Sequence, residues 1–249
     1  MITKLGLIGY PLGHSFSAGY FKNKFETEKI EGYSYQNFEI STIDLFPKII
    51  SDNPELLGLN VTIPYKEAVI PFLDELSPEA AAIGAVNTIK IIRKNGTIKL
   101  KGFNTDCHGF KESLKPFLAS NHYNALILGT GGAAKAVEYI LKEIGIEVMY
   151  VSRNASKKNE ISYEVLNEIA MKRFPLIINS TPLGMFPKTE VCPDIPYEYL
   201  DKNNLLFDLI YNPEETLFLK KGREKGAITL NGLQMLKLQA EKAWEIWTE

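Results

Sequence analysis

The chain has 249 residues, of which 45% are hydrophobic and 23% are charged, a composition typical of a globular protein with a substantial core. Its formal net charge of −2 argues against a broad binding surface for nucleic acid or anionic lipid. No apolar run has the length of a membrane span, and the N-terminus shows no signal-peptide pattern. We therefore expect neither a nucleic-acid nor a membrane partner.

The cysteines and histidines give no indication of a disulfide or a metal site. Cys107 and Cys192 are the only cysteines and lie far apart in the sequence, which is typical of free thiols in a reducing cytoplasm. The three histidines follow no ligand spacing, so we predict no metal. These features predict a cytoplasmic protein that acts on a small-molecule substrate, and they leave open whether it is a monomer or a homodimer.

The first hundred residues alternate apolar runs with helical patterns, as an α/β unit with parallel strands does. We expect strands over 5–9, 33–40 and 56–61, separated by helices over 17–29 and 42–51. Pro64 is expected near the first turn of another helix. Strands over 86–93 and 97–101 flank Asn95-Gly96, a strong signal for a two-residue hairpin, so this sheet is predicted to have an antiparallel edge.

A second α/β unit is predicted to start near Asn104. Its expected strands cover 124–128, 147–151, 176–179 and 205–209, and its clearest helices cover 105–118, 133–144 and 214–225. Gly145 is the expected C-cap of the second of these helices, and a last amphipathic helix is expected over 232–247. We therefore predict two α/β domains flanking a cleft, where ligands usually bind. The second domain is predicted to be a Rossmann-like doubly wound parallel sheet.

A glycine-rich loop lies between a strand and a helix of the second unit. Residues 124–136 form a strand pattern, a Gly-x-Gly-x-x-Ala turn and a helical pattern. Gly129 allows the tight turn, Gly131 lets the backbone approach a pyrophosphate, and Ala134 permits close packing of helix on strand. A plain strand–helix turn is the alternative, but the βαβ context favours a dinucleotide site.

The end of the following strand indicates which dinucleotide is bound. NAD-specific folds usually carry Asp or Glu there for the ribose 2′-hydroxyl, and neither occurs at 150–156. Ser152 and Arg153 occupy this position, with Lys157 and Lys158 close behind, and a guanidinium suits a 2′-phosphate. We predict NADP; a solvated loop with ordinary charges is the alternative.

Polar residues also follow several strands of the first unit. Ser15 and Ser17 follow the first strand, where helix capping and the binding of an anionic group such as a carboxylate are equally good interpretations. Asn60, Thr62 and Asn87 lie beyond other strand ends, which favours a single cleft that binds a polyol.

A lysine and an aspartate in this part of the chain can form the two halves of a proton-transfer device. Lys66 lies in the segment 58–66 and Asp106 in the segment 102–109, each just beyond a strand-like run. A lone lysine is more often a surface residue, and Asp106 is also a plausible helix N-cap. A proton donor beside a dinucleotide site favours reduction of a carbonyl by hydride.

Taken in order, the motifs resemble those of shikimate dehydrogenase over essentially the whole chain. The resemblance rests on 9–17, 58–66, 83–88, 102–109, 129–136, 179–185, 208–213 and 231–240. It implies reversible reduction of 3-dehydroshikimate to shikimate with NADPH, an oxidoreductase step of chorismate and aromatic amino-acid biosynthesis. The domains implied are a substrate-binding domain at 1–103, a dinucleotide-binding domain at 104–229, and a C-terminal helix at 230–249 that returns to the substrate domain.

The resemblance also implies roles for single residues. Lys66 and Asp106 are the implied catalytic residues. The implied substrate-binding residues are Ser15, Ser17, Thr62, Asn87, Tyr211 and Gln239. The implied cofactor-binding residues are Gly129, Thr130, Gly131, Gly132, Ala133, Ser152, Arg153, Asn154, Lys157, Leu209 and Gly232.

Three rival functions remain open at this stage. A quinate/shikimate dehydrogenase with relaxed cofactor use differs mainly in details of the pocket. Another two-domain dehydrogenase, acting on amino acids or folate derivatives, is disfavoured by the Asn-Val-Thr-x-Pro-x-Lys motif and by Gln239. A catalytically silent dinucleotide-binding regulator is disfavoured by the presence of Lys66, Asp106 and the glycine loop.

Overall fold

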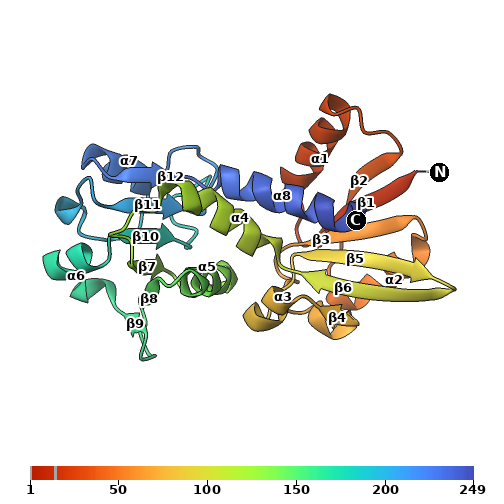
Figure 1. The fold of residues 1–249 in the computed structure, drawn as a ribbon, viewed down its shortest axis with the longest axis horizontal. Coiled ribbons are helices and arrows are strands. Elements are labelled where there is room, and N and C mark those ends of the chain that lie inside the picture. The colour runs from red at the N-terminus through yellow and green to blue at the C-terminus, as the bar shows by residue number, and fades with distance from the viewer. Residues whose placement is uncertain (1, 14–15) are drawn as a thin grey trace. The chain divides into compact units, whose positions relative to one another are not determined.

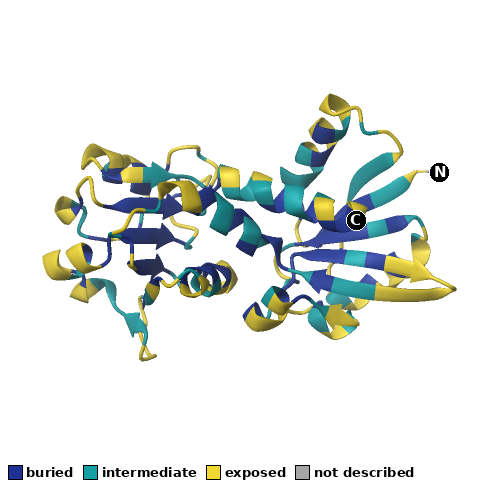
Figure 2. Ribbon diagram, viewed as in Figure 1, coloured by how far each residue is buried: buried dark blue, intermediate teal, exposed yellow. Residues whose placement is uncertain are grey.

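The computed structural model describes residues 2–13 and 16–249, which form two compact units (Figure 1). Of the described residues, those up to 105 and 239–249 form unit 1, and 106–238 form unit 2. Each unit is an α/β domain in which helices cover a β-sheet, and the buried residues are concentrated in the strands (Figure 2). In the part of the chain that the structure describes, no helix is both long and apolar enough to cross a membrane.

Unit 1 is built on a mixed six-stranded sheet. In chain order its elements are β1 (Thr3–Gly9), α1 (Phe16–Thr27), β2 (Tyr33–Glu39), η1 (Ile43–Leu45), α2 (Phe46–Asp52), β3 (Leu56–Val61), η2 (Ile70–Phe72), β4 (Glu75–Leu76), α3 (Pro78–Ile83), β5 (Thr88–Lys94), β6 (Thr97–Phe103) and the later part of α8 (Leu233–Thr248). The strand order is β2-β1-β3-β5-β6-β4. Strand β5 runs antiparallel to β3 and β6, and the other pairs are parallel.

The structure confirms the hairpin and corrects two details of unit 1. Asn95 and Gly96 have φ angles of 51° and 78°, as a two-residue turn with a right-handed strand twist requires. The edge of the sheet beyond the hairpin is the short strand β4, which the sequence pattern did not indicate. The helix expected after Pro64 is absent: residues 62–69 form turns, and the Ile63–Pro64 peptide is cis.

Two groups of helices cover the faces of the unit 1 sheet. Helices α1 and α8 supply Phe21, Ala240, Ala243 and Trp247 to one hydrophobic cluster with Leu5 of β1. Helices α2 and α3 contribute to a second cluster, together with residues of β1, β3 and β5. The later part of the C-terminal helix thus contributes to the core of unit 1.

Unit 2 is built on a six-stranded sheet in which every pair is parallel. Its elements are α4 (Thr105–Leu114), η3 (Lys115–Phe117), β7 (Asn124–Leu128), α5 (Gly132–Glu143), β8 (Glu147–Val151), β9 (Glu160–Ile161), η4 (Tyr163–Val165), α6 (Glu168–Arg173), β10 (Leu176–Asn179), η5 (Tyr197–Tyr199), β11 (Leu205–Asp208), α7 (Leu217–Glu224), β12 (Ile228–Leu230) and the start of α8. The order β9-β8-β7-β10-β11-β12 is that of the Rossmann fold, whose ligand crevice lies where the order reverses, between β7 and β10. The predicted Rossmann-like sheet is confirmed.

Candidate active site

The glycine loop lies at the point where the strand order of unit 2 reverses. Gly129 follows β7 with a φ of +98°, and a Cβ added to it would come within 2.9 Å of Cγ2 of Thr181, the second residue after β10. At Gly131 and Gly132 an added Cβ would meet nothing within 4 Å. The loop therefore leaves open space directly over the start of α5.

This surface fits the pyrophosphate of a dinucleotide. Helix α5 begins at Gly132, and the first N–H groups of a helix lack partners within it, so they favour an anion. Thr130 and Ala133 are exposed on the same loop, whereas Ala134 is buried, as close packing of α5 on the sheet requires. All five predicted loop residues, 129–133, thus lie at the carboxyl end of β7.

A hydrogen-bonded loop after β10 lies next to the glycine loop, where the strand order reverses. Asn179 accepts hydrogen bonds at Oδ1 from the backbone N–H (3.0 Å) and the hydroxyl (2.6 Å) of Thr181. Ser180 donates from Oγ to the carbonyl of Leu128 at 2.7 Å. Ser180 and Thr181 are not among the site residues predicted from the sequence. Both directly follow β10, at the crevice where a Rossmann-type sheet binds its ligand.

A buried aspartate anchors the loop after β11. Asp208 accepts hydrogen bonds from Asn179 Nδ2 (3.0 Å) and from Thr216 Oγ1 (2.6 Å). Burial raises the pKa of Asp208 to about 6, and these hydrogen bonds oppose the rise. Just beyond it, a Cβ added to Gly232 would overlap the carbonyl of Leu209, so these two predicted cofactor residues are in contact and glycine is required at 232.

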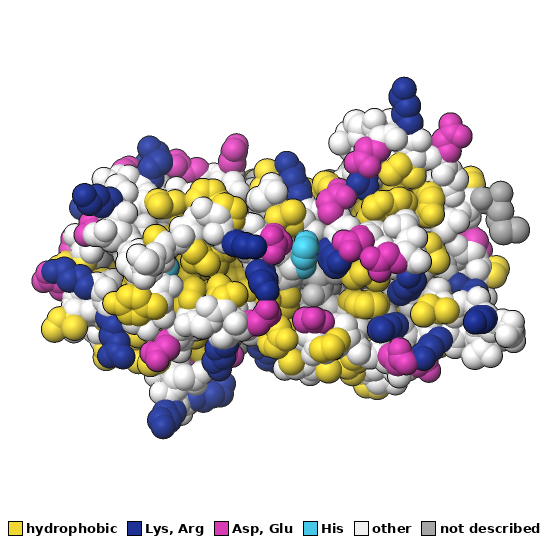
Figure 3. Space-filling view, in the orientation of Figure 1, with side chains coloured by type: hydrophobic (Ala, Val, Ile, Leu, Met, Phe, Trp, Pro, Cys, Tyr) yellow, Lys and Arg dark blue, Asp and Glu magenta, His cyan; other side chains and the backbone are white. Residues whose placement is uncertain are grey.

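The loop after β8 carries the residues predicted to recognise a 2′-phosphate. Arg153, Asn154 and Lys157 are exposed, and Ser152 accepts a hydrogen bond at Oγ from the Asn154 N–H at 3.3 Å. Lys and Arg side chains gather around the tip of this β8–β9 connection (Figure 3). The structure therefore presents a cationic loop at the carboxyl end of β8, the strand next to the glycine loop.

Asn87 is the hub of a buried polar cluster in unit 1. Its Oδ1 accepts from the backbone N–H of Thr105 at 2.7 Å, and its Nδ2 donates to Thr105 Oγ1 at 3.0 Å and to Gln239 Oε1 at 3.5 Å. All three residues are buried. Two of the predicted substrate residues are thus brought together although they are far apart in the sequence: Asn87, which directly precedes β5, and Gln239 of α8.

The cluster continues across the sheet toward α1. Asn60 donates from Nδ2 to Thr88 Oγ1 at 3.2 Å and accepts at Oδ1 from the Tyr35 hydroxyl at 2.8 Å. Burial raises the pKa of Tyr35, while a hydrogen bond from the Ser17 side chain opposes the rise. Thr88 Oγ1 in turn donates to Asn87 Oδ1 at 3.2 Å, so a row of polar contacts links Ser17 with Gln239. Tyr35 is absent from the sequence-based site, and Ser15 lies outside the described residues.

Lys66 and Thr62 lie in the turn that follows β3. The Lys66 carbonyl accepts from the Val86 N–H at 2.7 Å, so its main chain is fixed beside the residue preceding Asn87. The buried Tyr65 hydroxyl donates to the carbonyl of Ile40 at 2.6 Å and holds the turn from the other side. Thr62 and Lys66 are both half-buried. The turn is therefore an ordered segment at the carboxyl end of β3.

Two further predicted residues lie in unit 2. Asp106 is half-buried in the first turn of α4 and directly follows Thr105, which is bonded to Asn87. Tyr211 is exposed in the segment after β11. Within 2–13 and 16–249, no group of three or more His, Cys, Asp or Glu residues could hold a metal ion.

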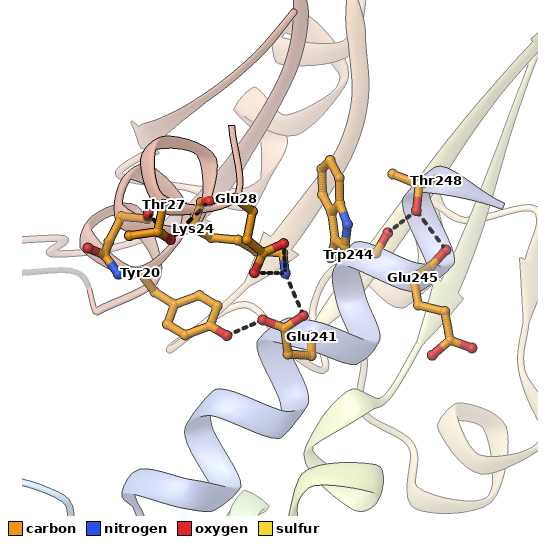
Figure 4. Close-up of polar contacts among 9 residues, drawn as sticks. Tyr20, Lys24, Thr27, Glu28, Glu241, Trp244, Glu245 and Thr248 are labelled. Atoms are coloured by element: carbon orange, nitrogen blue, oxygen red, sulfur yellow. Dashed lines mark hydrogen bonds and ion pairs between the residues drawn. The ribbon is translucent and has the colours of Figure 1, made fainter. Parts of the chain in front are cut away.

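An ionic contact joins α1 to the later part of α8 within unit 1. Lys24 is only 7% exposed, and its Nζ lies 2.8 Å from Glu28 and 2.8 Å from Glu241, which also accepts from the Tyr20 hydroxyl (Figure 4). Desolvation lowers the pKa of Lys24, but the two carboxylates outweigh it and raise the pKa overall. Glu241 lies two residues after Gln239, so the contact fixes the helix that carries Gln239 against the helix that carries Ser17.

Comparisons with known proteins agree with this geometry. Residues 7–89 match the family described as the shikimate dehydrogenase substrate binding domain. A shikimate dehydrogenase (NADP(+)) of Methanococcus maripaludis is 40% identical over 263 residues, covering 99% of this chain and 92% of the relative. The crystal structure of the Thermus thermophilus enzyme in complex with NADP(H) and shikimate has a TM-score of 0.85 and 32% identity, covering 99% of this chain and 94% of that one.

A third similar protein has a structure that contains NAD. The Listeria monocytogenes shikimate 5-dehydrogenase in complex with shikimate and NAD has a TM-score of 0.87 and 27% identity, covering 99% of this chain and 92% of that one. The similarity extends over nearly the whole chain, and it agrees with the resemblance to shikimate dehydrogenase that the sequence motifs indicated. The chain belongs to the shikimate dehydrogenase family.

Proposed function

We propose that this protein reduces 3-dehydroshikimate to shikimate with NADPH, reversibly, as an enzyme of aromatic biosynthesis. The observation that carries the proposal is the hydrogen-bonded row from Ser17 to Gln239, because its hydroxyls and amides match a small polyhydroxylated acid. The 40% identity to a shikimate dehydrogenase (NADP(+)) over nearly the full chain supports the same reaction.

The proposed reaction needs a hydride and a proton, which come from different groups. Bound NADPH supplies the hydride. The alkoxide that develops at C3 of the substrate needs a proton, and Lys66 is the proposed donor, with its neutral amine as the acceptor in the reverse direction. Asp106 is proposed to orient Lys66 and a ring hydroxyl. The Lys66 main-chain bond to Val86 and the rigid turn around it support such a role, because a proton donor must be held in place.

The remaining predicted residues are proposed to hold the two ligands. Ser15 and Ser17 bind the substrate carboxylate, and Thr62, Asn87, Tyr211 and Gln239 bind or flank the ring. Residues 129–133 hold the pyrophosphate, Leu209 and Gly232 lie at the nicotinamide end, and Ser152–Asn154 with Lys157 recognise the 2′-phosphate.

Product identification tests this function. Incubating the protein with 3-dehydroshikimate and NADPH is expected to consume NADPH and yield a product that co-elutes with shikimate and has its mass. Folded protein that consumes no NADPH above the rate without substrate would rule the function out.

We also infer a cytoplasmic location and a monomer or homodimer. Cys107 is buried and Cys192 half-buried, and both are free thiols, which supports a reducing compartment. Light scattering during size-exclusion chromatography distinguishes one copy from two.

Replacing Ser17 with alanine is expected to raise the KM for shikimate by about 10- to 150-fold, because a hydrogen bond to a charged group contributes roughly 1.5–3 kcal/mol. Ser17 lies inside α1 and does not precede it, so no N-cap is lost, and the unfolding free energy should fall only by the roughly 0.5–1.5 kcal/mol of its hydrogen bond to Tyr35. Steady-state kinetics and urea unfolding on the same preparation measure both. Ser51→Ala, in the last turn of α2, is the matched control. A large loss of stability with unchanged KM would assign Ser17 a purely structural role.

Replacing Arg153 with alanine is expected to raise the KM for NADP⁺ by about 10- to 150-fold, by the same strength of charged hydrogen bond. The KM for NAD⁺ should change little, because NAD⁺ has no 2′-phosphate. The ratio of kcat/KM for the two cofactors, in wild type and variant, is the measurement. Equal losses for both would mean that Arg153 supports the loop without recognising the phosphate.

A further inference from the structure

The β8–β9 loop, residues 152–159, is mostly exposed to solvent. Every residue from Arg153 to Lys158 is exposed. The two ends of the loop are fixed by the sheet, because the Tyr150 N–H donates to the carbonyl of Asn159 and the Ser152 N–H to that of Ile161, each at 2.9 Å. A segment with exposed side chains has low local stability unless polar contacts order its middle part.

The carboxylate of Glu160 makes such contacts. Its Oε2 accepts from the backbone N–H groups of Ser156 (3.0 Å) and Lys157 (3.3 Å), and its Oε1 lies 3.0 Å from Lys157 Nζ. The Glu160 side chain is 5% exposed, whereas that of Lys157 is 72% exposed. The loop therefore folds over the carboxylate and leaves the lysine on the outside.

Electrostatics agree with this arrangement. The N–H of Ser156, together with the ammonium and the N–H of Lys157, holds the pKa of Glu160 below its usual range. The group is therefore an anion at neutral pH, when each of these three donors is most strongly attracted to it.

We propose that Glu160 is a positioning residue for cofactor selection, which holds the β8–β9 loop in the shape that presents Arg153 and Lys157 to the 2′-phosphate of NADP. This inference rests on the proposed function of those two cations. Without the carboxylate, the loop must be ordered when the phosphate binds, and that ordering opposes binding. NAD⁺ makes no use of the phosphate contact, so its affinity does not depend on the loop shape.

Glu160 also places a negative charge beneath the loop that is proposed to bind the phosphate. Two substitutions separate the effect of this charge from the effect of the loop shape. Glu160→Ala removes both the charge and the acceptor oxygens. Glu160→Gln keeps one oxygen that accepts from the Ser156 and Lys157 N–H groups but removes the charge. If shape dominates, the alanine variant loses NADP⁺ affinity and the glutamine variant largely keeps it.

Calorimetric titration tests this with NADP⁺, NAD⁺ and the fragments 2′-phospho-AMP and AMP. We expect Glu160→Ala to weaken NADP⁺ and 2′-phospho-AMP about tenfold, equivalent to 1.4 kcal/mol, and to leave NAD⁺ and AMP unchanged. Glu160→Gln should stay close to wild type. Glu147→Ala, which removes an exposed glutamate at the opposite end of β8, is the control and should alter nothing. Thermal unfolding confirms that each variant is folded.

Three results would overturn the inference. Equal weakening of NADP⁺ and NAD⁺ would make Glu160 a general support of the domain. Tighter NADP⁺ binding in both variants would make its charge the dominant effect. Unchanged NADP⁺ affinity in Glu160→Ala would also reject it, and if Arg153→Ala still reduced that affinity, the proposed role of Arg153 would stand. Loss of the Arg153 effect would instead reject that role itself.

Discussion

Replacing Lys66 with alanine is expected to lower kcat by roughly 10²–10⁴-fold, the contribution of a positioned acid or base. The KM for shikimate should change far less, because the carboxylate and hydroxyl contacts proposed for the other residues remain. The fold should also survive, since the Lys66 main-chain bond to Val86 and the Tyr65 bond to Ile40 do not involve the lysine side chain. Initial rates of NADPH formation over a range of shikimate concentrations measure both constants.

Two companion variants sharpen this experiment. Lys48→Ala removes an exposed lysine from α2 and should leave both constants unchanged. Lys66→Arg keeps the positive charge but holds its proton too tightly for transfer near neutral pH, so its kcat should stay low. A Lys66→Ala enzyme with near-normal kcat and a greatly raised KM would move Lys66 from proton transfer to substrate binding.

Replacing Trp247 with alanine is expected to lower the free energy of unfolding by about 3–5 kcal/mol, the range for removing a large buried aromatic side chain. Trp247 is 2% exposed, its ring packs near Phe21 and Tyr35, and its Nε1 donates to the carbonyl of Ile89 at 2.9 Å. Denaturant unfolding at constant m-value gives the loss directly. A loss below about 1 kcal/mol would contradict the packing described for α8.

Gly58 provides an internal control for that prediction. A Cβ at this position would overlap the indole of Trp247, so Gly58→Ala should cost about 1–3 kcal/mol through overpacking. In the Gly58→Ala/Trp247→Ala double variant the added methyl occupies vacated space, and the two losses should sum to more than the measured total. Strict additivity would mean that the two residues do not contact each other.

Much of the fold was predictable because its strands and long helices carry strong periodic patterns. The strands at 56–61, 124–128 and 147–151 coincide with β3, β7 and β8, and each is an uninterrupted or alternating apolar run. The two-residue strands β4 and β9 are too short for any pattern, and pairing with β6 and β8 alone defines them. Helix α3 is also short, yet it carried signals: Ser77 caps it, Pro78 starts it, and Gly84 ends it with a φ of 71°.

The site also contains residues that the sequence could indicate and residues that it could not. The glycine loop and Arg153 were identifiable because a local segment carries their chemistry. Tyr35 and Glu160 were not, since each acts through partners that only the folded chain supplies: Asn60 on a neighbouring strand for one, and the N–H groups of a folded loop for the other. Residues whose role is to hold another residue leave little trace in a single sequence.

The ratio of kcat/KM for shikimate and quinate, each with NADP⁺ and with NAD⁺, tests the account most directly. We expect shikimate with NADP⁺ to give the highest value, a clear fall when NAD⁺ replaces NADP⁺, and a further fall with quinate. An enzyme that prefers quinate or NAD⁺, or folded protein that gives no shikimate-dependent reduction of NADP⁺, would contradict it.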